Sequence, residues 1–384
     1  MKKFALLTAP FLSMGVAAFC AEASADKLLT EQSSGFVAQE TNSRGSKAKG
    51  KGPMQEITPQ AKPEVTHSME PFVTGEFIYW KAYEENVHFA YTGAISTTGA
   101  NAEEGRVRSP ELGWEPGMKL GVGFKFLHDG WDLYTNWTWL NRFDGDKSAE
   151  TREDSVAHSL YHTVTTPTPG VLGDMTFDEA KSDWKMHFNA LDLELGRNFY
   201  ISPFVTLRPH FGLKFGWINQ KYTVKTYDFE MFQEFGGLLT PSYNAIRMEQ
   251  DFFGVGIRTG LDTFWYFTKN WGLYGDFAFA ALWSSFESER EDRFSAIDGV
   301  TSLQIAKVKN LNFERDLNTI TEVLELGLGV RYETTFSSGS YDFYIQAGWE
   351  EQIWFNQNQF LDTVDTRTGN ATFQGLTVKA CLMF

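Results

Sequence analysis

The sequence predicts an all-β protein: a transmembrane, antiparallel, up-and-down β-barrel of about ten strands, although ten to twelve strands fit the pattern. Three observations predict this class. Apolar and polar residues alternate along many segments, an export signal opens the chain, and no later apolar run approaches the roughly 18 residues of a membrane-spanning helix. Lipid offers backbone groups no hydrogen-bond partners, so only helices and closed barrels span membranes. The aromatic content of 16%, with 12 Trp, favours the barrel.

The first 25 residues have the pattern of a secretory signal peptide. Met1-Lys2-Lys3 precedes an apolar run that ends at Phe19, and Ala23-Ser24-Ala25 supplies a small-residue cleavage site. Cleavage after Ala25 or nearer Cys20 stays open. Once Cys20 is removed, the sequence retains Cys381 alone, which excludes an intramolecular disulfide framework and cysteine-based metal sites.

Residues 26–69 are predicted to form a disordered periplasmic arm before the barrel at 70–384. This segment is rich in Ser, Gly, Lys, Pro and Gln and nearly lacks aromatic residues, so it cannot bury a core. Its basic stretch, 43–53, is either a plain solvated linker or a tether to an anionic polymer.

Within the barrel region, four hairpins account for eight strands. Each hairpin joins two alternating segments around a short turn, at 128–130, 201–203, 269–270 and 337–339. A first strand near 72–81 and the terminal strand make ten. The connections between pairs are long, at roughly 82–112, 142–183, 219–249, 287–318 and 356–369. Short periplasmic turns with long extracellular loops are typical of outer-membrane barrels.

The terminal strand is the clearest single element. Leu376, Val378, Ala380, Leu382 and Phe384 fall on every second position, and the sequence stops on the aromatic Phe384. An ordinary surface strand of a soluble protein has the same alternation. Outer-membrane barrels, however, carry such a strand at their end, and Phe384 is therefore the predicted membrane-assembly signal, read by the barrel-assembly machinery.

The two faces of the strands suggest a lipid side and a lumen side. The apolar face must meet lipid, because a charge there costs about 2–4 kcal/mol at the bilayer midplane. Aromatic residues near strand ends are predicted to form interfacial girdles: Tyr79, Trp80, Trp131, Trp139, Trp217, Trp271 and Trp349. The predicted pore-lining residues are Glu76, Lys119, Lys125, Asp132, Asp192, Glu194, Arg208, His210, Lys214, Arg258, Asp262, Asp276, Glu325, Arg331, Glu333, Asp342, Glu350 and Lys379.

Charges interspersed with glycines fill a core poorly and suit a water-filled lumen. Ten strands, however, lie near the size at which side chains close a barrel, so the same charges could pair across a narrow lumen. The set contains ten acidic residues and seven Lys or Arg, which predicts a modest cation preference. The net charge of −15 argues against a nucleic-acid partner, and the sequence indicates no cofactor or metal.

Several segments resemble the Legionella-type major outer membrane proteins and their relatives in environmental chlamydiae. The resemblance covers about Glu70 to Phe384 and implies a porin-like, pore-forming outer-membrane barrel that is also a major surface protein. The chain lacks the many cysteines of chlamydial major outer membrane proteins, so a disulfide-crosslinked lattice is not implied. The segments that carry the resemblance are 75–82, 84–86, 114–121, 128–134, 137–139 and 191–197.

We therefore expect a channel for passive diffusion of small hydrophilic solutes or ions. The main alternative is a surface adhesin or structural protein with a closed lumen, whose loops contact host or other cell surfaces. A barrel hydrolase at the outer rim is a weaker alternative, resting on His88, His158 and His162 with Asp154 nearby, without a nucleophile elbow or a zinc-protease motif. The protein is thus not expected to be an enzyme. Outer-membrane lipid is a partner, and a homo-oligomer is left open.

Overall fold

The computed structural model describes most of the predicted barrel region. The predicted signal peptide, and all of the predicted arm except Met69, lie outside the described residues. These residues are 69–93, 105–126, 130–150, 156–159, 176–230, 239–298, 304–336, 341–362 and 366–384. No helix in this part of the chain is long and apolar enough to cross a membrane.

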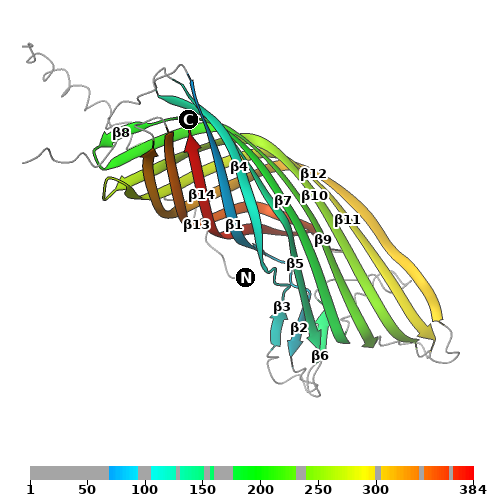
Figure 1. Ribbon diagram of the computed structural model, residues 1–384. Coiled ribbons are helices and arrows are strands. Elements are labelled where there is room, and N and C mark those ends of the chain that lie inside the picture. Colours follow the sequence, from blue (N-terminus) through cyan, green and yellow to red (C-terminus); the bar gives the residue numbers. More distant parts are fainter. Residues whose placement is uncertain are drawn as a thin grey trace, which may run out of the picture. The chain divides into compact units, whose positions relative to one another are not determined.

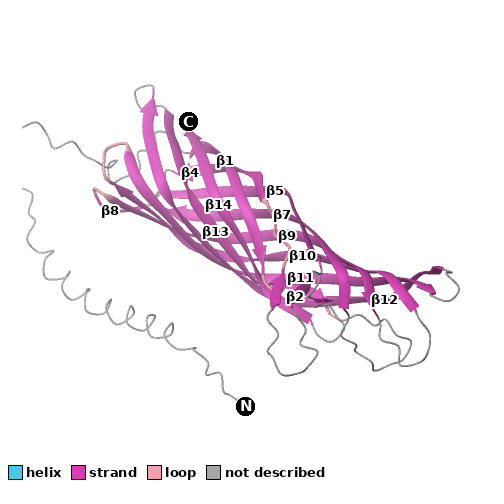
Figure 2. Ribbon diagram, turned by 90° about the horizontal axis from the view of Figure 1, so that it is seen from below, coloured by secondary structure: helices cyan, strands magenta, loops and turns pink. Residues whose placement is uncertain are grey.

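Ten long strands form one closed antiparallel ring, which confirms the predicted fold class (Figures 1 and 2). Each strand pairs with the next in chain order, and β14 pairs with β1 to close the ring. The strands are β1 (Met69–Glu84), β4 (Trp114–Phe126), β5 (Trp131–Glu150), β7 (Thr176–Arg197), β9 (Val205–Glu230), β10 (Leu239–Tyr266), β11 (Trp271–Asp298), β12 (Gln304–Phe336), β13 (Tyr341–Leu361) and β14 (Thr366–Met383).

Four short strands complete the sheet. β2 (Ala90–Gly93) lies between β3 (Gly105–Arg108) and β6 (Val156–Ser159), and β6 also pairs with the first residues of β7. β8 (Phe199–Ser202) pairs with β9 at the opposite end of the barrel. We call the end with the short turns the turn end and the other the loop end.

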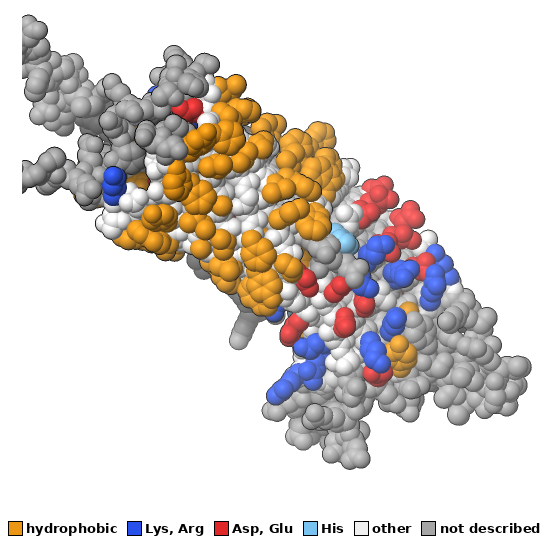
Figure 3. All heavy atoms as spheres, in the orientation of Figure 1, with side chains coloured by type: hydrophobic (Ala, Val, Ile, Leu, Met, Phe, Trp, Pro, Cys, Tyr) orange, Lys and Arg blue, Asp and Glu red, His pale blue; other side chains and the backbone are white. Residues whose placement is uncertain are grey.

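The alternation of exposed and buried residues agrees with the predicted faces. Leu120 and Leu328 on the outer face are 47% and 66% exposed, whereas Lys119 and Lys214 point inward and are 5% and 0% exposed. All ten long strands carry exposed apolar side chains, which form a belt around the turn-end half of the barrel. Figure 3 shows them gathered there on one face. The predicted position of Trp80 in the interfacial girdle is wrong. Trp80 faces inward and is fully buried, because it shares the inner face of β1 with Glu76.

The strands extend far into segments that the sequence marks as loops. β9 to β12 have 26 to 33 residues, and only residues 231–238 separate β9 from β10. Beyond the apolar belt their outer faces carry polar residues such as Asn219, Lys221 and Asp251. The outer face therefore stops being apolar there, although the strand continues. For this reason the predicted long loops at 219–249, 287–318 and 356–369 are wrong: these ranges are largely strand.

Candidate functional site: the barrel lumen

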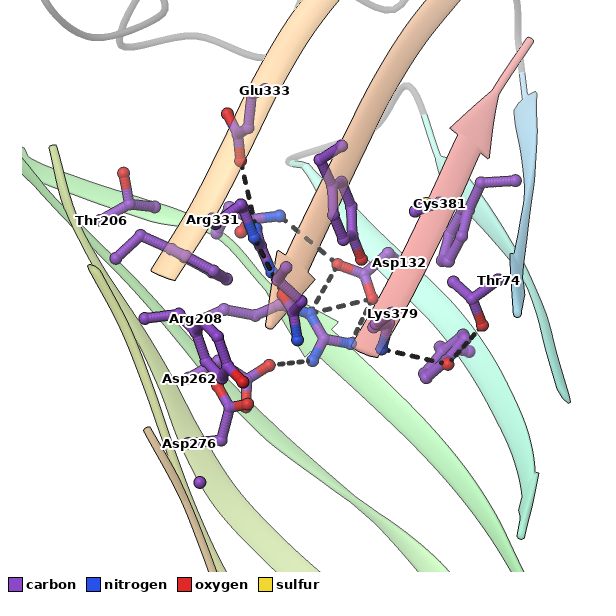
Figure 4. Close-up of a pocket in the computed structure, with 18 of the residues that line it drawn as sticks. Thr74, Asp132, Thr206, Arg208, Asp262, Asp276, Arg331, Glu333, Lys379 and Cys381 are labelled. Carbon is purple, nitrogen blue, oxygen red and sulfur yellow. Dashed lines mark hydrogen bonds and ion pairs between the residues drawn. The ribbon is translucent and has the colours of Figure 1, made fainter. Parts of the chain in front are cut away.

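A cavity of about 800 Å³ lies inside the barrel at the turn end (Figure 4). It reaches the turn residues Lys269 and Asn270 at its mouth. Of the predicted lumen residues, His210 and Lys214 do not line it: they are buried beneath neighbouring side chains. The other sixteen line the cavity: Glu76, Lys119, Lys125, Asp132, Asp192, Glu194, Arg208, Arg258, Asp262, Asp276, Glu325, Arg331, Glu333, Asp342, Glu350 and Lys379.

Most of these charges pair with one another across neighbouring strands. Lys214 Nζ lies 2.9 Å from Asp192 Oδ1 and 2.6 Å from Glu325 Oε1. Arg258 joins the same group, with Nη1 2.5 Å from Glu194 Oε1 and Nη2 2.6 Å from Glu325 Oε2. These side chains are at most 10% exposed, so solvent screens their attraction only weakly.

A second group centres on Arg208. Its guanidinium lies 2.5 Å from Asp132, 2.7 Å from Asp262 and 3.2 Å from Glu194. His210 Nε2 is 3.4 Å from Asp262 Oδ1. Arg208 therefore shares its one positive charge among carboxylates from three different strands, and Figure 4 shows it at the centre of these contacts.

Two lysines and one arginine pair on the opposite wall. Lys119 Nζ donates to Glu350 at 2.5 Å, and Lys379 Nζ lies 2.8 Å from Glu76. Arg331 donates to Gln346 and Glu333. Its guanidinium carbon also lies 3.7 Å and 4.0 Å from the ring centroids of Phe264 and Tyr344, so two aromatic faces hold this cation at the cavity mouth.

On the loop-end side of the charged layer the lumen is filled by an aromatic plug. We use this name for Trp80, Trp184, Phe188, Phe252, Phe286, Trp354 and Phe373, all at most 2% exposed. Phe188 packs against Phe373 and Trp354, with ring centroids 4.4 Å and 5.6 Å away. The charged layer touches the plug directly, because Lys119 lies over the Trp80 ring and Lys214 over the Trp354 ring.

A bulge in β13 helps to seal the plug. Trp354 pairs with Ala371 and Asn358 with Gly369, so β13 has two more residues than β14 in this stretch. Asn356 adopts a left-handed φ of 53°, and the inserted Gln357 is fully buried. Gln250 holds the bulge: its Nε2 donates to the Gln357 carbonyl, and its Oε1 accepts from the Gln359 N–H, both at 2.7 Å.

The predicted alternation does not include the plug, because it keeps the apolar face outward along the whole of each strand. In β9, however, Phe215 and Trp217 face out, whereas Ile218 and Tyr222 face in. This change of phase, visible in the sequence, is the signal that would have located the plug.

The histidines of the alternative hydrolase do not form a described cluster. His88 Nδ1 lies 2.8 Å from the Ser109 hydroxyl. Burial, together with the nearby Arg367, lowers the pKa of His88, so its imidazole is neutral at pH 7. His158 belongs to β6. His162 and Asp154 lie outside the described residues.

Comparisons with known proteins point to one family. Residues 62–384 match the family described as Legionella pneumophila major outer membrane protein precursor. No curated protein matches the chain at a significant level.

Solved outer-membrane structures are similar at low identity. The Escherichia coli outer membrane protease OmpT is 13% identical, with a TM-score of 0.39, over 86% of this chain and 99% of that one. A major outer membrane protein from Thermus thermophilus is 11% identical, with a TM-score of 0.25, over 83% and 100%. Pseudomonas aeruginosa OprG is 10% identical, with a TM-score of 0.24, over 81% and 96%.

The family match spans the complete barrel and its charged lumen, and it agrees with the resemblance of the strand motifs. The protein is therefore an integral outer-membrane β-barrel, and the chain belongs to the Legionella major outer membrane protein family.

Proposed function

We propose that the protein is an outer-membrane channel for passive diffusion of small hydrophilic solutes or ions, with a modest preference for cations. The observation that carries this proposal is the cavity of about 800 Å³ at membrane depth, lined by charged side chains. A barrel whose lumen had only a structural role would be more stable with a packed apolar interior, because buried ion pairs rarely exceed hydrophobic packing in stability.

The sign of the charge supports a cation preference. The cavity wall contains eleven Asp or Glu and seven Lys or Arg. Lys214, buried beside the cavity, contacts two of these carboxylates. An excess of three negative charges remains. A negative lining raises the local concentration of cations. The effect should weaken as salt rises, since the Debye length falls to about 3 Å at 1 M.

The aromatic plug limits the conductance that we propose. It fills the lumen on the loop-end side of the cavity, so passage from one end of the barrel to the other requires the plug to move. We therefore expect small, intermittent conductance steps rather than a permanently open pore.

Planar-bilayer recording of the refolded mature protein tests this function. Discrete steps with a reversal potential on the cation side, in a gradient of low-salt KCl, are expected. A clear anion preference would contradict the selectivity. Silence from a barrel that is folded by its heat-modifiable migration would overturn the channel.

The plug itself favours a second candidate function, that of a surface or structural protein with a closed lumen. In that case the loops would contact host or other cell surfaces. Adhesion of cells displaying the protein, compared with cells lacking it, tests this role. The proposal assigns no catalytic step; it includes assembly by the barrel-assembly machinery, with Phe384 as its signal, and leaves a homo-oligomer open.

A further inference from the structure

One carboxylate in the cavity stands outside the ion-pair network. Asp276 on β11 lines the cavity, yet within the described part of the chain no hydrogen bond or ion pair joins its carboxylate to another side chain. Its cross-strand neighbour is Asp262, whose charge is already matched by Arg208. Like charges on directly opposite residues destabilise a sheet. Arg331 and Lys379 attract the Asp276 carboxylate from beyond ion-pair distance, so its charge is only partly compensated (Figure 4).

The wall beside Asp276 has space. Its neighbour on β12 is Gly327, and a Cβ added there would lie 3.4 Å from Asp276 Oδ2. Beyond Gly327, Glu350 follows on β13. The two acidic side chains thus border a strip of wall without a side chain, and we call this strip the Asp276 recess.

Aromatic rings flank the recess towards the turn end. Tyr274 precedes Asp276 by two residues on the same face of β11. Its cross-strand neighbour is Phe264, whose ring is already covered by the Arg331 guanidinium, so Tyr274 is the ring that a ligand can meet. The Tyr274 ring lies against glycines of β12 and β13: a Cβ at Gly348 would come within 2.3 Å of its hydroxyl. Only glycine permits this close approach. Aromatic faces attract cations, and the attraction grows when water is excluded.

We propose that the Asp276 recess binds a small organic monocation, a primary ammonium group attached to an apolar body. This inference rests on the proposed function and names a solute class for it. The ammonium would donate to the Asp276 carboxylate, and the apolar body would lie against Tyr274. A single carboxylate without an ion-pair partner among the described residues calls for a single positive charge.

A metal ion fits the recess poorly. Among the described residues there is no group of three or more His, Cys, Asp or Glu arranged to hold one. Calcium takes six to eight oxygen ligands and magnesium six, far more than Asp276 offers. A cavity of about 800 Å³ is also large for a bare ion and suits a molecule with an apolar body.

Calorimetric titration of the folded barrel in detergent micelles tests the proposal. The probe is benzylammonium chloride, with benzyl alcohol as the uncharged analogue. Asp276→Asn should weaken benzylammonium binding roughly tenfold, since it removes a charge-assisted hydrogen bond. Asp342→Asn is the matched control: it removes the same charge at the cavity mouth, where Asp342 accepts a hydrogen bond from Thr335, and should change affinity less than about twofold.

A second variant guards against misfolding of Asp276→Asn. Gly327→Ala keeps every charge and narrows the recess beside Asp276, so it should weaken benzylammonium binding as well. Equal affinity of the unmodified protein and both variants would overturn the proposal, as would equal binding of benzyl alcohol and benzylammonium. Conductance separates the two hypotheses: a silent bilayer overturns the channel alone, whereas a conducting barrel without benzylammonium binding overturns the recess alone.

Discussion

The same strands form two regions of the barrel: the turn-end half with the apolar belt, which we call the membrane half, and the loop-end part beyond the belt, which we call the extension. In the two regions the apolar side chains lie on opposite faces of the strands. In the membrane half Trp217 and Phe253 face outward while Lys214 and Arg258 face inward. A few residues further along, Asn219 and Asp251 face outward while Ile218 and Phe252 are buried inside. β9 and β10 thus exchange their apolar faces at the edge of the apolar belt.

The solvent outside the barrel explains this exchange. Where lipid covers the outside, apolar side chains gain nothing by pointing inward, and the lumen can hold charges. Where water covers the outside, the hydrophobic effect drives apolar side chains inward, at about 25 cal/mol per Å² of buried area. The extension is therefore built like a soluble barrel with a packed core, and the membrane half like an inverted one.

The largest effect should come from opening the core of the extension. Trp354→Ala removes the plug ring that contacts Phe188, Phe252 and Lys214, and should lower the free energy of unfolding by about 3–5 kcal/mol. It should also raise single-channel conductance, because it clears part of the lumen. Urea titration and bilayer recording measure the two effects. Trp283→Ala is the control, since this outward-facing residue is 74% exposed. Equal effects of the two variants would contradict the claim that Trp354 belongs to a packed core that closes the lumen.

A slightly smaller effect is expected from the charged layer of the membrane half. Lys214→Met leaves the Asp192 carboxylate with only the Arg258 Nε at 3.9 Å, and should cost about 3 kcal/mol in unfolding free energy. Lys221→Met, in the exposed pair with Glu249 on the extension, should cost at most about 1 kcal/mol. Urea titrations measure the unfolding free energy of both variants. A similar loss of free energy in each would show that water screens the buried ion pairs of the charged layer as it screens the exposed pair.

The smallest effect should come from the bulge that seals the plug. Gln250→Leu leaves the Gln357 carbonyl and the Gln359 N–H without their partner, which should cost about 2 kcal/mol and increase the frequency of channel opening. Gln374→Leu, on the outer face of β14, serves as the control. Unchanged opening in Gln250→Leu would mean that the bulge does not seal the lumen.

Much of the architecture follows from local pattern. The strands, including the terminal one, are marked by side chains that alternate with a two-residue period. The four short turns separate neighbouring segments of this kind, so the pairing can be predicted without knowledge of distant contacts. Strand length did not follow, because the expected apolar outer face disappears at residues such as Asn219 while hydrogen bonding to the next strand continues. Trp80 was misplaced for a related reason: an aromatic residue near a strand end suits a girdle and a core equally.

The candidate site divides in the same way. The barrel class, the terminal strand and the set of charged residues on one face follow from the amino-acid pattern alone, since each depends on the alternation of side chains along one strand. Three features depend on the tertiary structure: Arg208 gathers carboxylates from three strands, Asp276 has no ion-pair partner among the described residues, and Phe188 and Trp354 close the lumen. Such contacts depend on strand register and barrel closure, which join residues far apart in the chain and have no local signature.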